Sequence, residues 1–114
     1  MSTSRLVLTS LVGVGAVAVA LPAAAATPLL KGSVGPGFTI GLAKKPTKAG
    51  KYAFVITDKA SIHSFHLVGP GVNKKLTSVG GTGTSKPVTL TLKKGTYNYF
   101  CDLHPSLKGS FKVG

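Results

Sequence analysis

Hydrophobic and polar positions alternate with a period of two through much of this chain. Because successive side chains of a strand point to opposite faces, such runs predict strands with one buried face. Turn-forming residues separate the runs, and residues 27–114 show no helical periodicity with capping residues. The alternating runs lie at residues 38–42, 52–56, 63–67, 88–92, 97–101 and 111–113.

The spacing of these short strands predicts an all-β fold, either a sandwich or a small barrel. A length of 114 residues allows one domain of ordinary size. We place this domain at residues 36–114 and expect residues 27–35 to be a linker or a first edge strand.

Residues 1–26 have the order of features of a secretory signal peptide. Arg5 supplies the positive start, an apolar stretch follows at residues 6–21, and small residues lead to Ala26. The stretch falls short of the ~20 apolar residues of a membrane-spanning helix. We therefore expect cleavage near Ala26 and export to the periplasm, the cell surface or the medium. An uncleaved anchor is the alternative.

Cys101 is the single cysteine, so the chain forms no internal disulfide. In an oxidising compartment an exposed thiol is open to oxidation, and we expect Cys101 to be buried or bound. Asp58 and Asp102 are the only acidic residues, too few for the acid and base roles of a typical hydrolase. We expect no enzymatic activity.

Cys101 and the histidines fall in two short segments, His63-x-x-His66 and Cys101-x-x-His104. All four donors together would make a tetrahedral zinc site. Two histidines with the cysteine would make a trigonal copper site with a weak or absent axial ligand. A buried inert cysteine with surface histidines is the structural alternative.

Strand parity favours the copper site. Residues three apart in a strand point to opposite faces, and His63 shares the apolar face of Phe65 and Leu67 while His66 does not. His63, Cys101 and His104 can converge without a break in the strand. A soft thiolate with two imidazoles in an apolar pocket favours copper, and zinc is the less favoured ion.

Two segments resemble the cupredoxins, the blue-copper family of plastocyanin and amicyanin. Residues 57–71 resemble the segment with the first histidine ligand, and residues 95–113 resemble the C-terminal ligand loop. The resemblance implies a Greek-key β-sandwich and one-electron transfer between Cu(I) and Cu(II). It assigns the imidazole roles to His63 and His104 and the thiolate role to Cys101.

The sequence departs from the family at two positions. Leu107 occupies the place of the usual axial methionine, and Met1, the only methionine, lies in the signal peptide. The copper would then be three-coordinate or have a backbone oxygen or water nearby. Ser64 stands where the family has an asparagine that ties the two ligand loops together.

Lysines supply all the positive charge after Arg5, and the formal net charge of the chain is +12. Such a surface gives solubility or steers docking to an acidic redox partner or an anionic membrane. We expect no nucleic-acid partner, because the chain has no arginine after Arg5 and no basic-aromatic motif, and export is predicted.

The sequence therefore predicts a monomeric electron carrier that exchanges electrons through the edge of His104. Pro105 and Leu107 would form its apolar docking patch. A copper storage or delivery protein and a metal-free basic interaction module are the alternatives.

Overall fold

The computed structural model describes residues 26–114, so nearly all of the predicted signal peptide lies outside the described residues. The described part is built from strands alone, which confirms the predicted all-β class. No helix in residues 26–114 is long and apolar enough to cross a membrane. The strands are β1 (Leu29–Val34), β2 (Ile40–Leu42), β3 (Gly50–Asp58), β4 (Phe65–Gly69), β5 (Val72–Thr77), β6 (Gly83–Thr84), β7 (Val88–Leu92), β8 (Gly95–Phe100) and β9 (Lys108–Val113).

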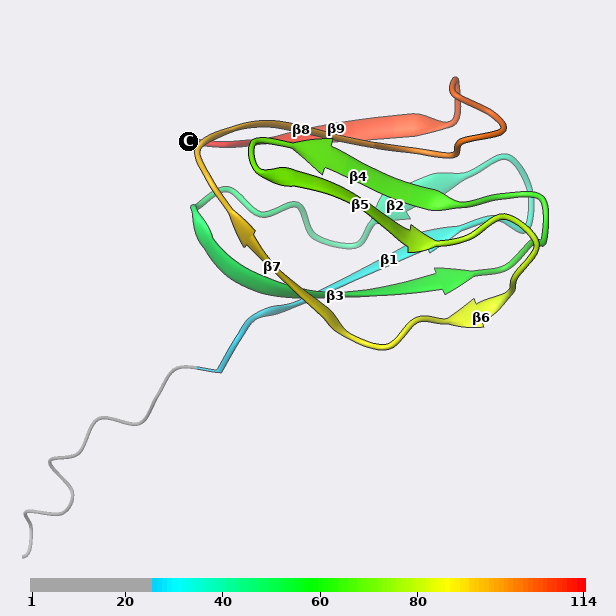
Figure 1. Ribbon diagram of the computed structural model, residues 1–114, viewed down its shortest axis with the longest axis horizontal. Helices are drawn as coiled ribbons and strands as arrows, with labels where there is room; N and C mark the ends of the chain where they lie inside the picture. The colour runs from blue at the N-terminus through cyan, green and yellow to red at the C-terminus, as the bar shows by residue number, and fades with distance from the viewer. Residues whose placement is uncertain (1–25) are drawn as a thin grey trace, which may run out of the picture.

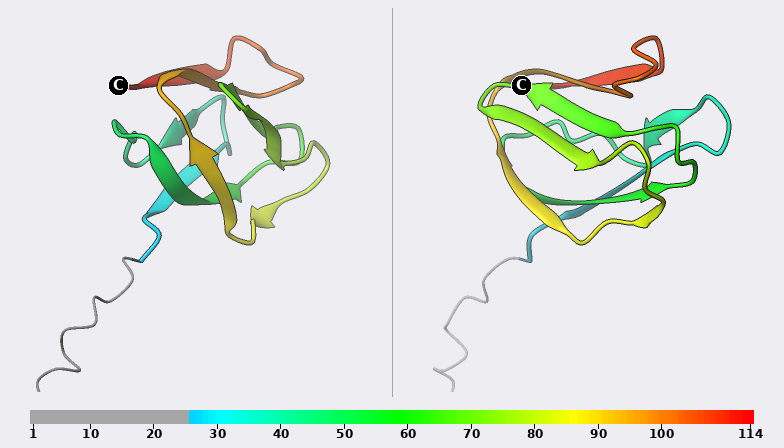
Figure 2. Two further views of the ribbon diagram at one scale, coloured as in Figure 1. Left: turned by 60° about the vertical axis from the view of Figure 1, so that its left-hand side comes forward. Right: turned by 45° about the vertical axis from the view of Figure 1, so that its right-hand side comes forward.

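The strands form two sheets that pack as a sandwich (Figure 1). One sheet has the order β2-β1-β3, with β6 and β7 both paired to β3. The other has the order β5-β4-β8-β9 and is antiparallel throughout. The predicted sandwich is thus confirmed, and the chain passes between the sheets after β3, β5 and β7 (Figure 2).

The segment before residue 36 differs from its prediction. Strand β1 runs parallel to β3, from the pair Leu29–Ala53 to the pair Val34–Asp58, and pairs with β2 on its other side. It is therefore an inner strand of its sheet and neither a linker nor an edge strand. Leu30 and Val34 are buried in the core, so the sandwich includes residues before the predicted boundary at 36.

The inward faces of both sheets supply the core, as the alternation predicts. Phe65 stacks on Tyr99 with ring centroids 5.1 Å apart, and Tyr97 stacks on Phe111 at 5.3 Å. The ring of Tyr97 lies against Gly69, where any added Cβ atom would clash with it. Glycine therefore lets an aromatic ring pack directly on a neighbouring strand.

Four loops gather at one end of the sandwich, opposite the C-terminus (Figure 1). They are the loops β1–β2, β3–β4, β5–β6 and β8–β9. The residues of the predicted metal site lie in two of these loops, so the fold itself brings them to the same end.

Candidate metal centre

His63, Cys101 and His104 meet at this end of the sandwich. One donor atom from each residue lies within 4.8 Å of the other two. The Sγ atom of Cys101 is 3.7 Å from Nδ1 of His63 and 3.6 Å from Nδ1 of His104. His63 and Cys101 are fully buried, and His104 is partly exposed. The structure thus brings together the three residues chosen from the sequence.

The pairing of β4 with β8 explains this meeting. The two strands are antiparallel neighbours, with His66 opposite Phe100 and Leu67 opposite Tyr99. The start of β4 therefore lies beside the end of β8. His63 comes two residues before β4, and Cys101 directly follows β8.

Backbone hydrogen bonds close the loop that carries His104. The N–H of Leu107 donates to the carbonyl oxygen of His104 at 2.8 Å, and the N–H of Cys101 donates to the carbonyl oxygen of Leu107 at 3.1 Å. This compact turn folds His104 back toward the sulfur, as the short spacing between the two residues suggested.

A backbone carbonyl selects the tautomer of His63. Nε2 of His63 lies 2.9 Å from the carbonyl oxygen of Gly37, which can only accept a hydrogen bond. Nε2 therefore carries the proton, and the lone pair is on Nδ1, the atom that faces Cys101. A metal-binding histidine typically donates its second ring N–H in this way.

Phe38 covers both imidazoles, a contact that was not predicted from the sequence. Its ring makes edge contacts with His63 and His104, at centroid distances of 5.3 and 5.1 Å. The side chain is 68% exposed. Its alternation with Ile40 suggested a strand position, but β2 begins only at Ile40 and Phe38 belongs to the preceding loop. The turn-forming residues Gly35, Pro36 and Gly37, directly before Phe38, are the sequence feature that could have indicated a loop at this position.

The surroundings of Cys101 favour the thiolate. Burial raises the pKa of the thiol, but the hydrogen bond from the Ser64 N–H and those from the ring and the backbone of His104 lower it by more, to about 6. The Ser64 N–H lies 3.4 Å from Sγ. The sulfur is thus set up to act as an anionic ligand.

His66 lies outside the cluster, as parity predicted. Its Nδ1 atom is 2.9 Å from Oδ1 of Asp102, and its Nε2 atom faces Asn73. The four-donor arrangement of a tetrahedral zinc site is therefore not formed by these residues. The donor set that remains is two imidazoles and one thiolate.

Leu107 does not form part of an apolar docking surface. Only 8% of it is exposed, and it belongs to the core, whereas Pro105 is exposed as predicted. Phe38, Ile62 and Leu103 are large apolar side chains that are exposed in the β1–β2, β3–β4 and β8–β9 loops. The carbonyl oxygen of Ile62 also lies 3.9 Å from Sγ of Cys101, so a backbone oxygen approaches the cluster.

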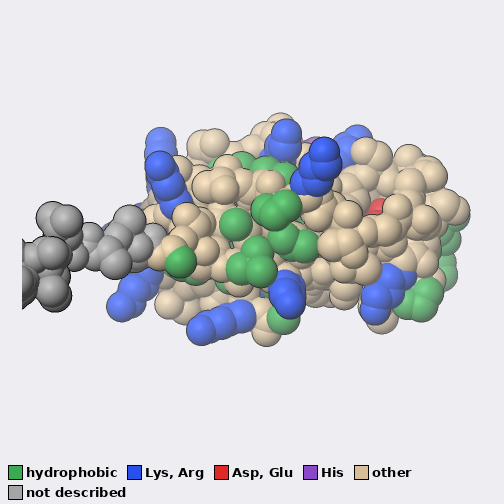
Figure 3. Space-filling view, turned by 90° about the horizontal axis from the view of Figure 1, so that it is seen from below, with side chains coloured by type: hydrophobic (Ala, Val, Ile, Leu, Met, Phe, Trp, Pro, Cys, Tyr) green, Lys and Arg blue, Asp and Glu red, His purple; other side chains and the backbone are tan. Residues whose placement is uncertain are grey.

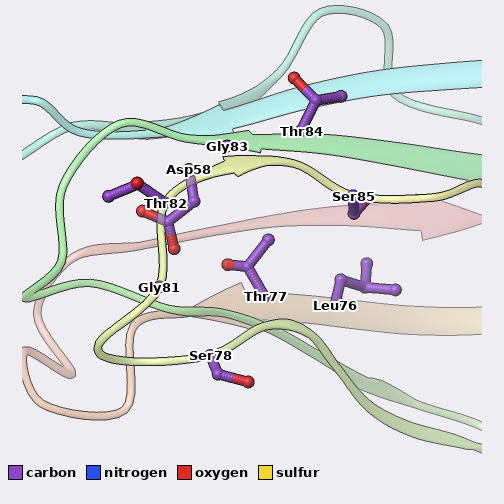
Figure 4. A pocket seen from close by; sticks show the side chains of 9 residues that line it. All are labelled: Asp58, Leu76, Thr77, Ser78, Gly81, Thr82, Gly83, Thr84 and Ser85. Carbon is purple, nitrogen blue, oxygen red and sulfur yellow. The ribbon is translucent and has the colours of Figure 1, made fainter.

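A separate cavity of ≈ 270 Å³ lies between β3, β5 and β6 and contains no histidine or cysteine (Figure 4). Asp58 extends into it, and the hydroxyl of Thr77 points toward the same space. Oδ1 of Asp58 accepts a hydrogen bond from the N–H of Ala60 in the β3–β4 loop. In the described residues this carboxylate fixes the loop before His63 and does not join the His–Cys cluster.

No protein-family model matches the chain, and no curated protein matches it significantly. The functional conclusion therefore depends on the residues of the cluster and on their chemistry.

Proposed function

We propose that this protein is an exported copper protein of the cupredoxin family that carries single electrons. The observation that supports this most directly is the convergence of the Cys101 sulfur with the Nδ1 atoms of His63 and His104. One thiolate and two imidazoles are a donor set that suits copper, with its preference for soft sulfur ligands.

The protein's own groups supply a site formed in advance. A pKa of about 6 makes Cys101 available as a thiolate near neutral pH. Gly37 holds His63 in the tautomer that leaves Nδ1 free. Copper bound there would supply the reversible one-electron chemistry. Donors fixed at the ends of two paired strands would move little between oxidation states, which keeps electron exchange fast.

The partly exposed imidazole gives the route for electrons. His104 is the one donor residue of the cluster that reaches the surface, where it lies beside the exposed ring of Phe38. Pro105, Leu103 and Phe38 surround this position with exposed apolar surface. A redox partner would dock here, and we propose that the carrier has no catalytic reaction of its own.

The charge of the surface suggests the partner's charge. Lysines are spread over the face in Figure 3 and are not gathered into one patch. Such a distribution favours a partner with an acidic docking face, or an anionic membrane surface, through long-range attraction. We propose that the protein acts as a monomer.

Copper storage or delivery is the second candidate. It is favoured by the lack of any methionine in residues 26–114 and by the partial exposure of His104. A site that is open on one side and lacks a thioether could release Cu(I) to an acceptor. A metal-free interaction module remains if no copper binds.

Titration of the purified protein with Cu(II) tests the proposal. We expect one intense thiolate-to-copper band in the visible region, saturating at one copper per chain and reversibly bleached by a reductant. Cys101→Ser is the matched control and should give no such band, because a hydroxyl is a harder and much weaker ligand. Equal copper binding by wild type and Cys101→Ser, with no band in either, would contradict the proposed centre. Rapid loss of Cu(I) to a chelator without reversible cycling would favour storage.

A further inference from the structure

A hydrogen-bond network connects the residues that directly follow two of the donors. Asp102 follows Cys101, and Ser64 follows His63. The Ser64 hydroxyl donates to Oδ2 of Asp102 at 2.7 Å and accepts the backbone N–H of Asp102 at 3.0 Å. Ser64 is fully buried, so its hydroxyl has no access to water as an alternative partner, whereas Asp102 is partly exposed. The side chain and the backbone of Asp102 are thus both bonded to one hydroxyl group.

This network sets the position of the sulfur. The backbone N–H of Ser64 points to Sγ of Cys101 at 3.4 Å while its side chain holds the peptide that follows Cys101. A rotation of the Asp102 carboxylate would release the Ser64 hydroxyl and loosen both contacts. The orientation of that carboxylate therefore matters for the geometry of the cluster.

His66 is placed to fix this orientation. Its Nδ1 atom donates to Oδ1 of Asp102, the carboxylate oxygen that Ser64 does not use. The imidazole is itself held by stacking on Phe100, at a centroid distance of 4.9 Å, and by Asn73 at Nε2. Burial raises the pKa of Asp102, but His66, Ser64 and Lys75 lower it by more, so an ionised carboxylate is favoured.

Lys75 is a poor substitute for His66. Its Nζ atom lies 3.7 Å from Oδ2, and its side chain is 48% exposed, against 18% for His66. A long exposed side chain in such a pair contributes little fixed geometry. Removal of His66 would leave Oδ1 of Asp102 without its fixed partner.

We propose that His66 is a positioning residue of the metal centre: through Asp102 and Ser64 it holds the Cys101 sulfur in place against the two imidazoles. This inference rests on the proposed function for its consequence at copper, but the network itself consists of hydrogen bonds between the chain's own groups. It gives a role to the one histidine that is not a ligand.

Three substitutions at one position separate hydrogen bonding from packing. His66→Asn retains an N–H close to the place of Nδ1, where it can still donate to Asp102. His66→Gln places its N–H near that of Nε2, toward Asn73, and His66→Leu keeps bulk but has no donor. Asn73→Ala is the matched control, because it removes the outer partner of His66 and leaves the Asp102 bond in place.

The first measurement uses the metal-free protein. Hydrogen exchange of the Asp102 amide, followed by NMR, should accelerate about tenfold in His66→Leu and His66→Gln, the loss expected for a charge-assisted hydrogen bond. His66→Asn and Asn73→Ala should stay close to wild type. Equal exchange in all the proteins, or equal acceleration in all three His66 variants, would overturn the positioning role. If His66→Leu does not fold, the Asn and Gln pair decides alone.

The second measurement uses the copper-loaded proteins and their electron paramagnetic resonance spectra. We expect a broadened or shifted copper signal in His66→Gln and a wild-type signal in His66→Asn, with one copper bound in each. An unchanged signal in His66→Gln would overturn the role at the metal. A wild type that binds no copper while the exchange pattern holds would instead reject the proposed function and leave the network standing.

Discussion

The backbone N–H of Cys101 donates a hydrogen bond to the carbonyl oxygen of Leu107, at 3.1 Å. The residue that supplies the thiol is thus bonded directly to Leu107, the residue that the family resemblance assigns to the axial position. This bond closes the ligand loop and fixes the backbone on both sides of His104. The side chain of Leu107 is at the same time buried in the core.

Leu107→Met tests what lies on the axial side of the cluster. A thioether stabilises Cu(II) relative to Cu(I), so we expect the reduction potential to fall. The exchange conserves volume and should cost less than ~1.5 kcal/mol of stability. Voltammetry of the folded, copper-loaded protein provides the measurement. A potential that stays constant or rises would assign the axial side to the Ile62 carbonyl oxygen, which is 3.9 Å from the sulfur.

His63→Ala should abolish the visible band, whereas His66→Ala should retain it. His63 is buried with Nδ1 facing the sulfur, so its loss should abolish the band. His66 is bonded to Asp102 instead, and its variant should still bind one copper through the thiolate. Absorption titrations with Cu(II) make the comparison. A band lost with His66 and retained without His63 would exchange the two assignments.

The metal-free protein should titrate at Cys101 near pH 6. The ultraviolet absorbance of the thiolate should rise with a midpoint of about 6, and Cys101→Ser should lack this transition. The folded pKa is below that of an unfolded thiol, ~8.5, so the thiolate adds stability that is complete above ~8.5. That added free energy of unfolding should be lost as the pH falls toward 6. A midpoint near ~8.5 in the folded protein would contradict this environment.

Phe38→Ala should open the centre to water and to small chelators. The ring covers both imidazoles, so we expect Cu(I) to transfer several-fold faster to a competing chelator. Phe38 is mostly exposed, and the free energy of unfolding should change by less than about 0.5 kcal/mol. Leu103→Ala, which removes another exposed apolar side chain from the same loops, is the control. Equal transfer rates in both variants would show that the ring does not shield the site.

The lysine surface predicts a salt dependence of electron exchange. Oxidation of the reduced copper protein by hexacyanoferrate(III), a multivalent anion, should slow as salt is added, because the screening length falls from ~10 Å at 0.1 M to ~3 Å at 1 M. A cationic cobalt complex should show the reverse trend. Stopped-flow measurements with both reagents provide the test. A flat profile with both would limit the charge to a role in solubility.

The sequence alone was sufficient for the all-β class and for the choice of His63, Cys101 and His104. Alternation reports which face of a strand a residue occupies, and this local property separated His63 from His66. The residue types then limited the chemistry, because one cysteine thiolate with two histidine imidazoles is a donor set that suits copper.

Tertiary structure decided what depends on contacts between distant segments. Only the pairing of β1 with both β2 and β3 shows that it is an inner strand. Phe38 reaches the imidazoles because the β1–β2 loop lies over the loops of His63 and His104. The link from His66 to Asp102 joins residues 36 positions apart. Periodicity cannot encode such contacts, since they arise from how the sheets and loops pack together.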